Sequence, residues 1–262
     1  MSFQPVVVGV GLGAWSFLKA TQESQRTAHK ADAVSQREDQ YFRETIGSID
    51  TAADLVSDRR LLSIALQAFG LSNDLQNTFF LQKILEEGTQ DTGALANRLA
   101  DSRYTAFSQA FGFGDSPTPR TKLSGFATEI LTRAQEQRFE EAVGVQDDTL
   151  RQALYFERQM PELAQGASSD SSRWFKLMGD RPLRTVMEQA LGLPQSFGRL
   201  DIDKQLEMFR DKAEQRFGSS DIDVLAQPEV MENIVRTFLL RQQVSQSLNV
   251  SSASIALTLL QS

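Results

Sequence analysis

The chain has 262 residues, 40% hydrophobic and 23% charged, with a net charge of −7 at pH 7, so it can bury the core of one large or two small domains. The acidic balance, with no basic run longer than Arg59-Arg60, disfavours nucleic acid and anionic membranes as partners. No apolar stretch reaches about 18 residues, so we expect no membrane span, and the absence of cysteine excludes disulfides and thiolate sites.

The N-terminal stretch PVVVGVGLGAW, residues 5–15, resembles the start of a dinucleotide-binding fold, because Gly9 to Ala14 satisfy a relaxed glycine pattern. That fold also needs a parallel sheet and an acidic residue at the end of a second strand. Asp32 is available, but no strand-forming run precedes it. We therefore predict a flexible, uncharged lead-in over residues 5–14, no binding of nicotinamide or flavin nucleotides, and no cofactor.

Beyond the lead-in, the hydrophobic spacing predicts one helix after another. Three helices end at a glycine suited to a left-handed cap, namely those of Leu62 to Phe69, Tyr104 to Phe111 and Leu183 to Ala190. Further helices are predicted over residues 36–48, 77–87, 121–143, 148–164, 202–217 and 228–245. The predicted fold class is all-α and multi-helical.

Two of the glycine-capped helices also form an internal repeat. SDRRLLSIALQAFGL at 57–71 aligns without a gap on GDRPLRTVMEQALGL at 179–193, and residues 98–113 are a looser relative. The sequence therefore predicts two pseudo-repeated helical units joined by longer helices. The predicted segments are 1–45 (lead-in and first helix), 46–114 (first unit), 115–171 (connecting helices), 172–241 (second unit) and 242–262 (tail helix).

An Asp-Arg pair recurs at the start of the repeated helices. The pairs are Asp58 with Arg59, Asp101 with Arg103, and Asp180 with Arg181. Their return at equivalent places would suit a charged binding site, but an aspartate at a helix start also accepts a bond from a free backbone amide. We predict structural caps, with the arginines tying helix starts together across the pseudo-dyad.

Residues for metal or acid-base chemistry are sparse. The single histidine, His29, lies in a polar stretch and is interpreted as solvated, without partners for a zinc site or a catalytic triad. The acidic pairs Asp201 with Asp203 and Asp221 with Asp223 lack the spacing of a calcium loop, so helix capping is preferred. We predict no catalytic residue and no metal site.

The aromatic residues mostly follow helical core spacing. We expect Phe69, Phe107, Phe111, Phe139 and Phe209 in the core. Trp174 follows a serine-rich connection and is interpreted as a packing anchor between the units, with ligand stacking as the minor alternative.

Both ends of the chain are uncharged, since no charged side chain precedes Lys19 or follows Arg241. An apolar helix without charges is normally buried against something. The tail therefore either packs on its own chain or contacts a partner. The predicted contact residues are Ile255, Leu257, Leu259 and Leu260.

Several strings together resemble a bacterial family of domains of unknown function, number 1217. They are DLVSDRRLLSIALQAFGLSNDLQN, DTGALANRLADSRYTAFSQAFGFG, LRQALYFERQM, LMGDRPLRTVMEQALGLP and LDIDKQLEMF, within residues 40–241. The resemblance implies a helical fold, sometimes duplicated, and genes that lie among flagellar genes in alphaproteobacteria. It implies no established activity or catalytic residue.

These observations together favour a non-enzymatic structural or interaction protein associated with the bacterial flagellum. The expected partner is a flagellar component or a second copy of the chain. The alternative is a helical ligand-binding or regulatory module with a pocket between the two units. We expect the protein in the cytoplasm, or exported to the flagellum without a cleaved signal peptide, because no positive charges precede the apolar N-terminal run.

Overall fold

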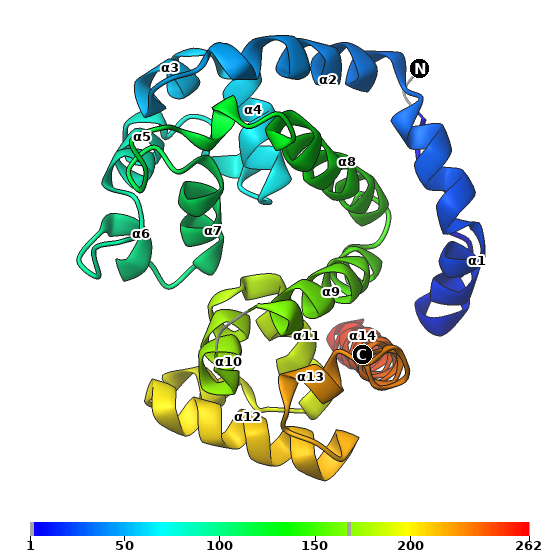
Figure 1. Cartoon of the computed structure of the whole chain (residues 1–262). Helices are drawn as coiled ribbons and strands as arrows, with labels where there is room; N and C mark the ends of the chain where they lie inside the picture. Colours follow the sequence, from blue (N-terminus) through cyan, green and yellow to red (C-terminus); the bar gives the residue numbers. More distant parts are fainter. Residues whose placement is uncertain (1–2, 167–168, 262) are drawn as a thin grey trace. The chain divides into compact units, whose positions relative to one another are not determined.

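The computed structural model describes residues 3–166 and 169–261, except for the side chains of Gln195 and of residues 246–261. Over these described residues the chain forms fourteen α-helices and four short 3-10 helices, with no β-strand (Figure 1). The predicted all-α, multi-helical class is confirmed.

The helices form two compact units, one of residues 1–6 and 21–142 and the other of residues 7–20 and 143–262. One boundary lies between residues 6 and 7, and the other two fall inside helix α1 (Gly11–Lys30) and helix α8 (Phe126–Gly144). The segment 115–171, expected to connect the units, is therefore divided between them. Most of α8 belongs to the first unit, and the helix after it belongs to the second.

The first unit is built around an aromatic core. Its remaining helices are α2 (Ala33–Thr45), α3 (Ala52–Ser57), α4 (Arg59–Ala68), α5 (Thr78–Glu87), α6 (Leu95–Arg98) and α7 (Ser102–Phe111), with 3-10 helices η1 (Ile46–Ser48), η2 (Ser72–Asp74) and η3 (Arg120–Lys122). The ring of Phe111 meets those of Phe107 and Phe126 edge to face, with centroids 5.2 and 5.1 Å away. Phe107 in turn meets Phe69. Because these rings contact one another inside the unit, the phenylalanines recur at the spacing of a buried helix face.

The second unit has its own core. Its helices are α9 (Asp148–Gln165), α10 (Asp170–Gly179), α11 (Arg181–Leu191), α12 (Ile202–Phe217), α13 (Ile222–Leu225) and α14 (Pro228–Gln261), with the 3-10 helix η4 (Gln195–Arg199). Helix α11 packs against both α9 and α14. Trp174 is fully buried, lies 5.7 Å from the ring of Phe209, and donates from Nε1 to the carbonyl of Ser220 at 2.9 Å. These contacts place Trp174 in the core of the second unit, and its expected role between the units stays a prediction.

The elements follow a similar order in the two units. In the first, α2, α3 and α4 precede η2, α5, the four-residue α6 and α7. In the second, α9, α10 and α11 precede η4, α12, the four-residue α13 and α14. Helices α4 and α11 both end at a glycine with positive φ, +67° at Gly70 and +71° at Gly192. This order is what a duplication requires, and the duplication itself stays a prediction.

The glycine-rich N-terminus is a turn and a helix start. The chain reverses at Gly9 and Gly11, whose φ values are +90° and +56°, and α1 begins at Gly11. The preceding residues lie along α1, since the Gln25 amide accepts from Val6 N at 2.6 Å and donates to Val6 O at 3.0 Å. The expectation of a flexible lead-in over residues 5–14 is therefore wrong, because the glycines allow a defined reversal and Ala14 is buried in a helix.

Three predicted helices differ clearly from the observed ones at their ends. The helix predicted over residues 121–143 is α8, which starts only at Phe126, after the separate 3-10 helix η3. The helix predicted over residues 36–48 is α2, which starts three residues earlier because the Asp32 carboxylate accepts from Val34 N and Ser35 N. The helix predicted over residues 228–245 is α14, which continues to Gln261.

Candidate functional site

Asp58 stands at the junction of two helices of the first unit. It ends α3 and begins α4, and its Oδ1 accepts from Arg60 N and Leu61 N, both at 3.0 Å. Its Oδ2 accepts from the hydroxyl of Tyr41 at 2.5 Å. Arg59 points elsewhere and donates to Gln76 at 3.5 Å. The aspartate thus fixes the start of a core helix.

Asp180 occupies the same kind of junction in the second unit. It ends α10 and begins α11, accepts from Leu183 N at 3.1 Å, and accepts from the hydroxyl of Tyr155 at 2.6 Å. Asp180 and Tyr155 are both buried, whereas Arg181 is exposed. Asp58 and Asp180 therefore each hold a helix start by accepting hydrogen bonds from a backbone amide and from a tyrosine hydroxyl.

The third pair joins two helices of the first unit. Asp101 caps α7 by accepting from Arg103 N at 3.0 Å, and the Arg103 guanidinium returns to the same carboxylate at 2.6 Å. Another nitrogen of Arg103 donates to the carbonyl of Gly70, at the end of α4, at 2.6 Å. Arg103 thus ties a helix start to a helix end within one unit, which differs from the expected tie between helix starts across a pseudo-dyad.

Replacing the two junction aspartates by alanine tests how much these caps stabilise the fold. We expect Asp58→Ala to lower the free energy of unfolding by about 0.5–2 kcal/mol, the usual value of an N-cap. Asp180→Ala should cost more, because it leaves the buried Tyr155 hydroxyl without its acceptor. Denaturant unfolding measures both, with Asp→Asn at each position as the control that keeps a capping oxygen. Unchanged stability together with lost partner binding would make these residues a functional site.

His29 is buried, so its interpretation as a solvated histidine is wrong. Its ring lies edge to face between Phe3 and Phe139, with centroids 6.5 and 5.9 Å away. Burial, together with the positive charge of Arg138, lowers the pKa of His29, against a smaller opposing effect of Asp32. The neutral ring therefore fills an aromatic niche at the C-terminal end of α1.

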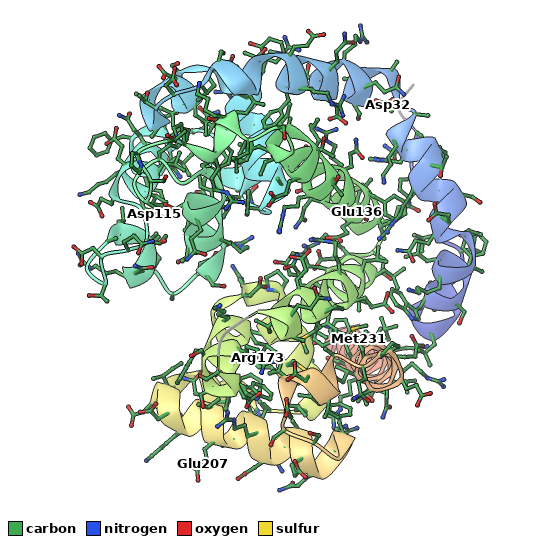
Figure 2. All side chains as sticks on the ribbon, in the orientation of Figure 1. Asp32, Asp115, Glu136, Arg173, Glu207 and Met231 are labelled. Carbon is green, nitrogen blue, oxygen red and sulfur yellow. The ribbon has the colours of Figure 1, made fainter. Side chains whose placement is uncertain are left out.

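The expected helix capping is found in one of the two acidic pairs of the second unit. Asp221 caps α13 by accepting from Asp223 N at 2.9 Å, and Asp223 forms an ion pair with Arg173, which is labelled in Figure 2. Asp201 stands at the N-cap of α12 without a capping side-chain bond, and Asp203 lies in the first turn of that helix. Among the described residues, no three His, Cys, Asp or Glu side chains come close enough together to hold a metal ion.

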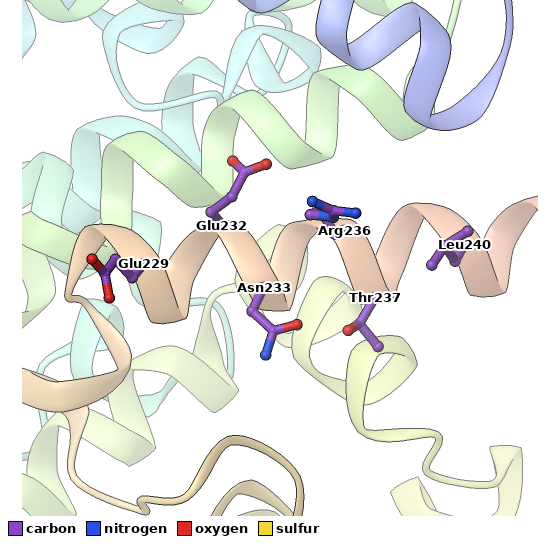
Figure 3. A pocket seen from close by; sticks show the side chains of 6 residues that line it. All are labelled: Glu229, Glu232, Asn233, Arg236, Thr237 and Leu240. Carbon is purple, nitrogen blue, oxygen red and sulfur yellow. The ribbon is translucent and has the colours of Figure 1, made fainter.

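Helix α14 presents the broadest candidate surface. Its inner face, with Ile234, Val235, Phe238 and Leu239, is buried in the second unit. The opposite face lines a hollow of about 400 Å³ (Figure 3). The lining residues are Glu229, Glu232, Asn233, Arg236, Thr237 and Leu240, at the three- and four-residue spacing of one helix face. We define these six residues as the α14 outer face.

The character of this helix changes along its length. The α14 outer face carries three charged residues up to Arg236, but Leu240 is 47% exposed and Val244, one turn further, is 57% exposed. After Arg241 the sequence has no charge, and the backbone stays helical to Gln261. The predicted contact residues Ile255, Leu257, Leu259 and Leu260 belong to this part, and their side chains lie outside the described ones. Within the described part of the chain, no helix is both long and apolar enough to cross a membrane.

Comparison with known proteins places the chain among proteins without an assigned role. A family model described as a protein of unknown function (DUF1217) matches residues 68–231. No curated protein matches the chain. The X-ray structure of protein AGR_C_984 from Agrobacterium tumefaciens, a structural genomics target, is similar with a TM-score of 0.74 and 24% identity, over 92% of this chain and 97% of that one. This likeness shows a shared fold.

Proposed function

The chain belongs to the DUF1217 family of proteins of unknown function, and we propose that it acts as a non-enzymatic interaction protein that assembles through helix α14. The observation that carries the proposal is the change along this single helix of 34 residues, whose sequence loses all charge after Arg241. At 1.5 Å per residue such a helix is about 50 Å long.

The chemistry of this helix favours a helical partner segment of low charge. The N-terminal half of α14 is fixed in the second unit through its own buried side chains, such as Phe238 and Leu239. The exposed Leu240 and Val244 continue into the uncharged segment, so apolar contact rather than ion pairing would supply the affinity. Burial of an apolar side chain of this size contributes roughly 1.5–3 kcal/mol before ordering costs.

We place this role at the bacterial flagellum on the resemblance to a family whose genes lie among flagellar genes. The partner is then a flagellar component, with self-association as the other outcome that the experiment separates.

Deleting residues 246–262 is expected to leave the melting temperature nearly unchanged and to abolish association. The measurements are thermal unfolding, sedimentation of the purified chain, and capture of partners from flagellated cells. Leu240→Asp with Val244→Asp should weaken association likewise, because charge is placed on the exposed apolar surface, while Glu229→Gln serves as a control on the same helix.

Two outcomes would contradict this proposal. A clear fall in melting temperature on truncation would mean that the tail packs on its own chain. A truncated protein that melts, associates and supports swimming normally would leave the tail without an assembly role.

A further inference from the structure

A second hollow in the second unit gathers positive charge. It has a volume of about 420 Å³. Its lining residues are Leu191, Gly192, Lys212, Gln215, Arg216 and Arg241. They come from the end of α11, the last turns of α12 and the middle of α14. We call this hollow the basic pocket.

The three cations of the basic pocket have no acidic counterpart. Lys212 donates only to Gln215, at 3.4 Å, and neither Arg216 nor Arg241 forms an ion pair or hydrogen bond with a described residue. The residues whose side chains are not described include no aspartate or glutamate.

Some other arginines of the same unit are paired. Arg173 pairs with Asp223, Arg184 with Glu188, and Arg210 with Asp170. Arg181, Arg199 and Arg236 of this unit form no ion pair with a described residue either, so the basic pocket is distinguished by three cations that line one hollow with no carboxylate among its lining residues.

Gly192 makes room for one of these cations. A Cβ at this position would lie 2.2 Å from Nη1 of Arg241, and the φ of +71° also favours glycine. Burial and the charge of Arg216 lower the pKa of Arg241. The guanidinium is thus held close to a like charge, an arrangement that a bound anion would relieve.

The competing explanation is that these cations compensate the negative ends of α11 and α12, where the pocket lies. An arginine in that role typically donates to the last carbonyls of the helix. Arg216 and Arg241 make no such bond to the described residues. Their nitrogens remain available to an added acceptor.

We propose that Lys212, Arg216 and Arg241 form a binding site for the phosphate group of a phosphomonoester. A phosphate dianion balances more of the positive charge of the pocket than one carboxylate does. Its oxygens can also accept hydrogen bonds from the paired nitrogens of two guanidinium groups. The volume of about 420 Å³ lies in the range of small-molecule sites, so it admits an organic group beyond the phosphate itself. This inference is independent of the role proposed for the end of α14.

Calorimetric titration of the full chain at low ionic strength tests the site. The probes are inorganic phosphate, glycerol 3-phosphate, and vesicles of phosphatidylcholine with phosphatidic acid. We expect glycerol 3-phosphate to bind more tightly than acetate, and Arg216→Gln with Arg241→Gln to weaken its binding at least about tenfold. Arg181→Gln, at the other end of α11, should leave binding unchanged. Preference for the vesicles over the soluble ester would assign the phosphate to a lipid headgroup.

The proposal is overturned if no phosphate probe binds the unmodified chain, or if the double variant binds as well as the unmodified chain. It is also overturned if acetate binds equally well. If the unmodified chain binds no phosphate probe and the double variant has a lower melting temperature, the arginines serve only to compensate the negative helix ends. Circular dichroism of each variant shows whether its fold is retained.

Discussion

Gly114→Ala is expected to destabilise the first unit by at least about 3 kcal/mol, at the upper end of what overpacking costs. A Cβ on Gly114 would lie 2.4 Å from both the carbonyl oxygen of Glu86 and the backbone nitrogen of Gly88. Both are backbone atoms, so no side chain can turn away to relieve the contact. The segment after α7 would have to separate from the end of α5.

That separation would also break the contacts of the next residue. The carboxylate of Asp115, which is labelled in Figure 2, accepts from Thr89 N at 2.6 Å, from the Thr89 hydroxyl at 2.9 Å, and from Gln90 N at 3.2 Å. The start of the loop after α5 depends on these bonds, because they satisfy the backbone amides of Thr89 and Gln90.

The matched control is Gly47→Ala, since a Cβ at Gly47 meets no atom within 4 Å. Its stability should stay within about 0.5 kcal/mol of the unmodified protein, as for most unconstrained surface changes. Urea unfolding followed by far-ultraviolet circular dichroism measures both variants. Equal stability of the two variants would show that the α5 and α7 segments are not held as closely as the structure places them.

The parts of the fold that the sequence predicts are those controlled by neighbouring residues. Gly70, Gly112 and Gly192 do adopt positive φ after the helices they were expected to end, because only glycine takes that conformation without strain. Asp58 and Asp180 lie at the starts of α4 and α11 and accept backbone amides there. Each of these features depends on residues within one helical turn.

The parts that the sequence does not reveal depend on residues far apart in the chain. His29 is enclosed by Phe3 and Phe139, and no spacing around His29 indicates either ring. Helix α1 begins among glycines, which disfavour helices locally, and the Gln25 bonds to Val6 show a tertiary contribution that propensity omits. The basic pocket likewise combines three helices, with Arg241 distant in sequence from Lys212 and Arg216.

The same distance in sequence conceals a buried ion pair in the first unit. Asp39 of α2 accepts from Nη1 of Arg138 in α8 at 2.6 Å, and the two side chains are only 10% and 11% exposed. Gln135 donates to the other oxygen of Asp39 at 2.7 Å, and Arg138 donates from Nε to Gln67 of α4 at 2.6 Å. Four side chains thus connect three helices with directed bonds.

Removing one member of this network is expected to cost more than removing the pair. Asp39→Ala should lower the free energy of unfolding by roughly 3–5 kcal/mol, because it leaves the charge of Arg138 buried without the carboxylate that balances it. The double variant Asp39→Leu with Arg138→Met should recover part of this loss, since two apolar side chains need no counter-charge.

An exposed pair that joins α2 to α4 provides the control. Glu38 and Arg60 lie 3.2 Å apart with side chains 38% and 49% exposed, so Glu38→Ala should cost less than about 1 kcal/mol. Urea unfolding of the single and double variants gives the coupling energy between Asp39 and Arg138 from a double-mutant cycle. A coupling no larger than that of the Glu38 and Arg60 pair would mean that water screens Arg138, and that α8 is held on α2 and α4 by apolar contacts alone.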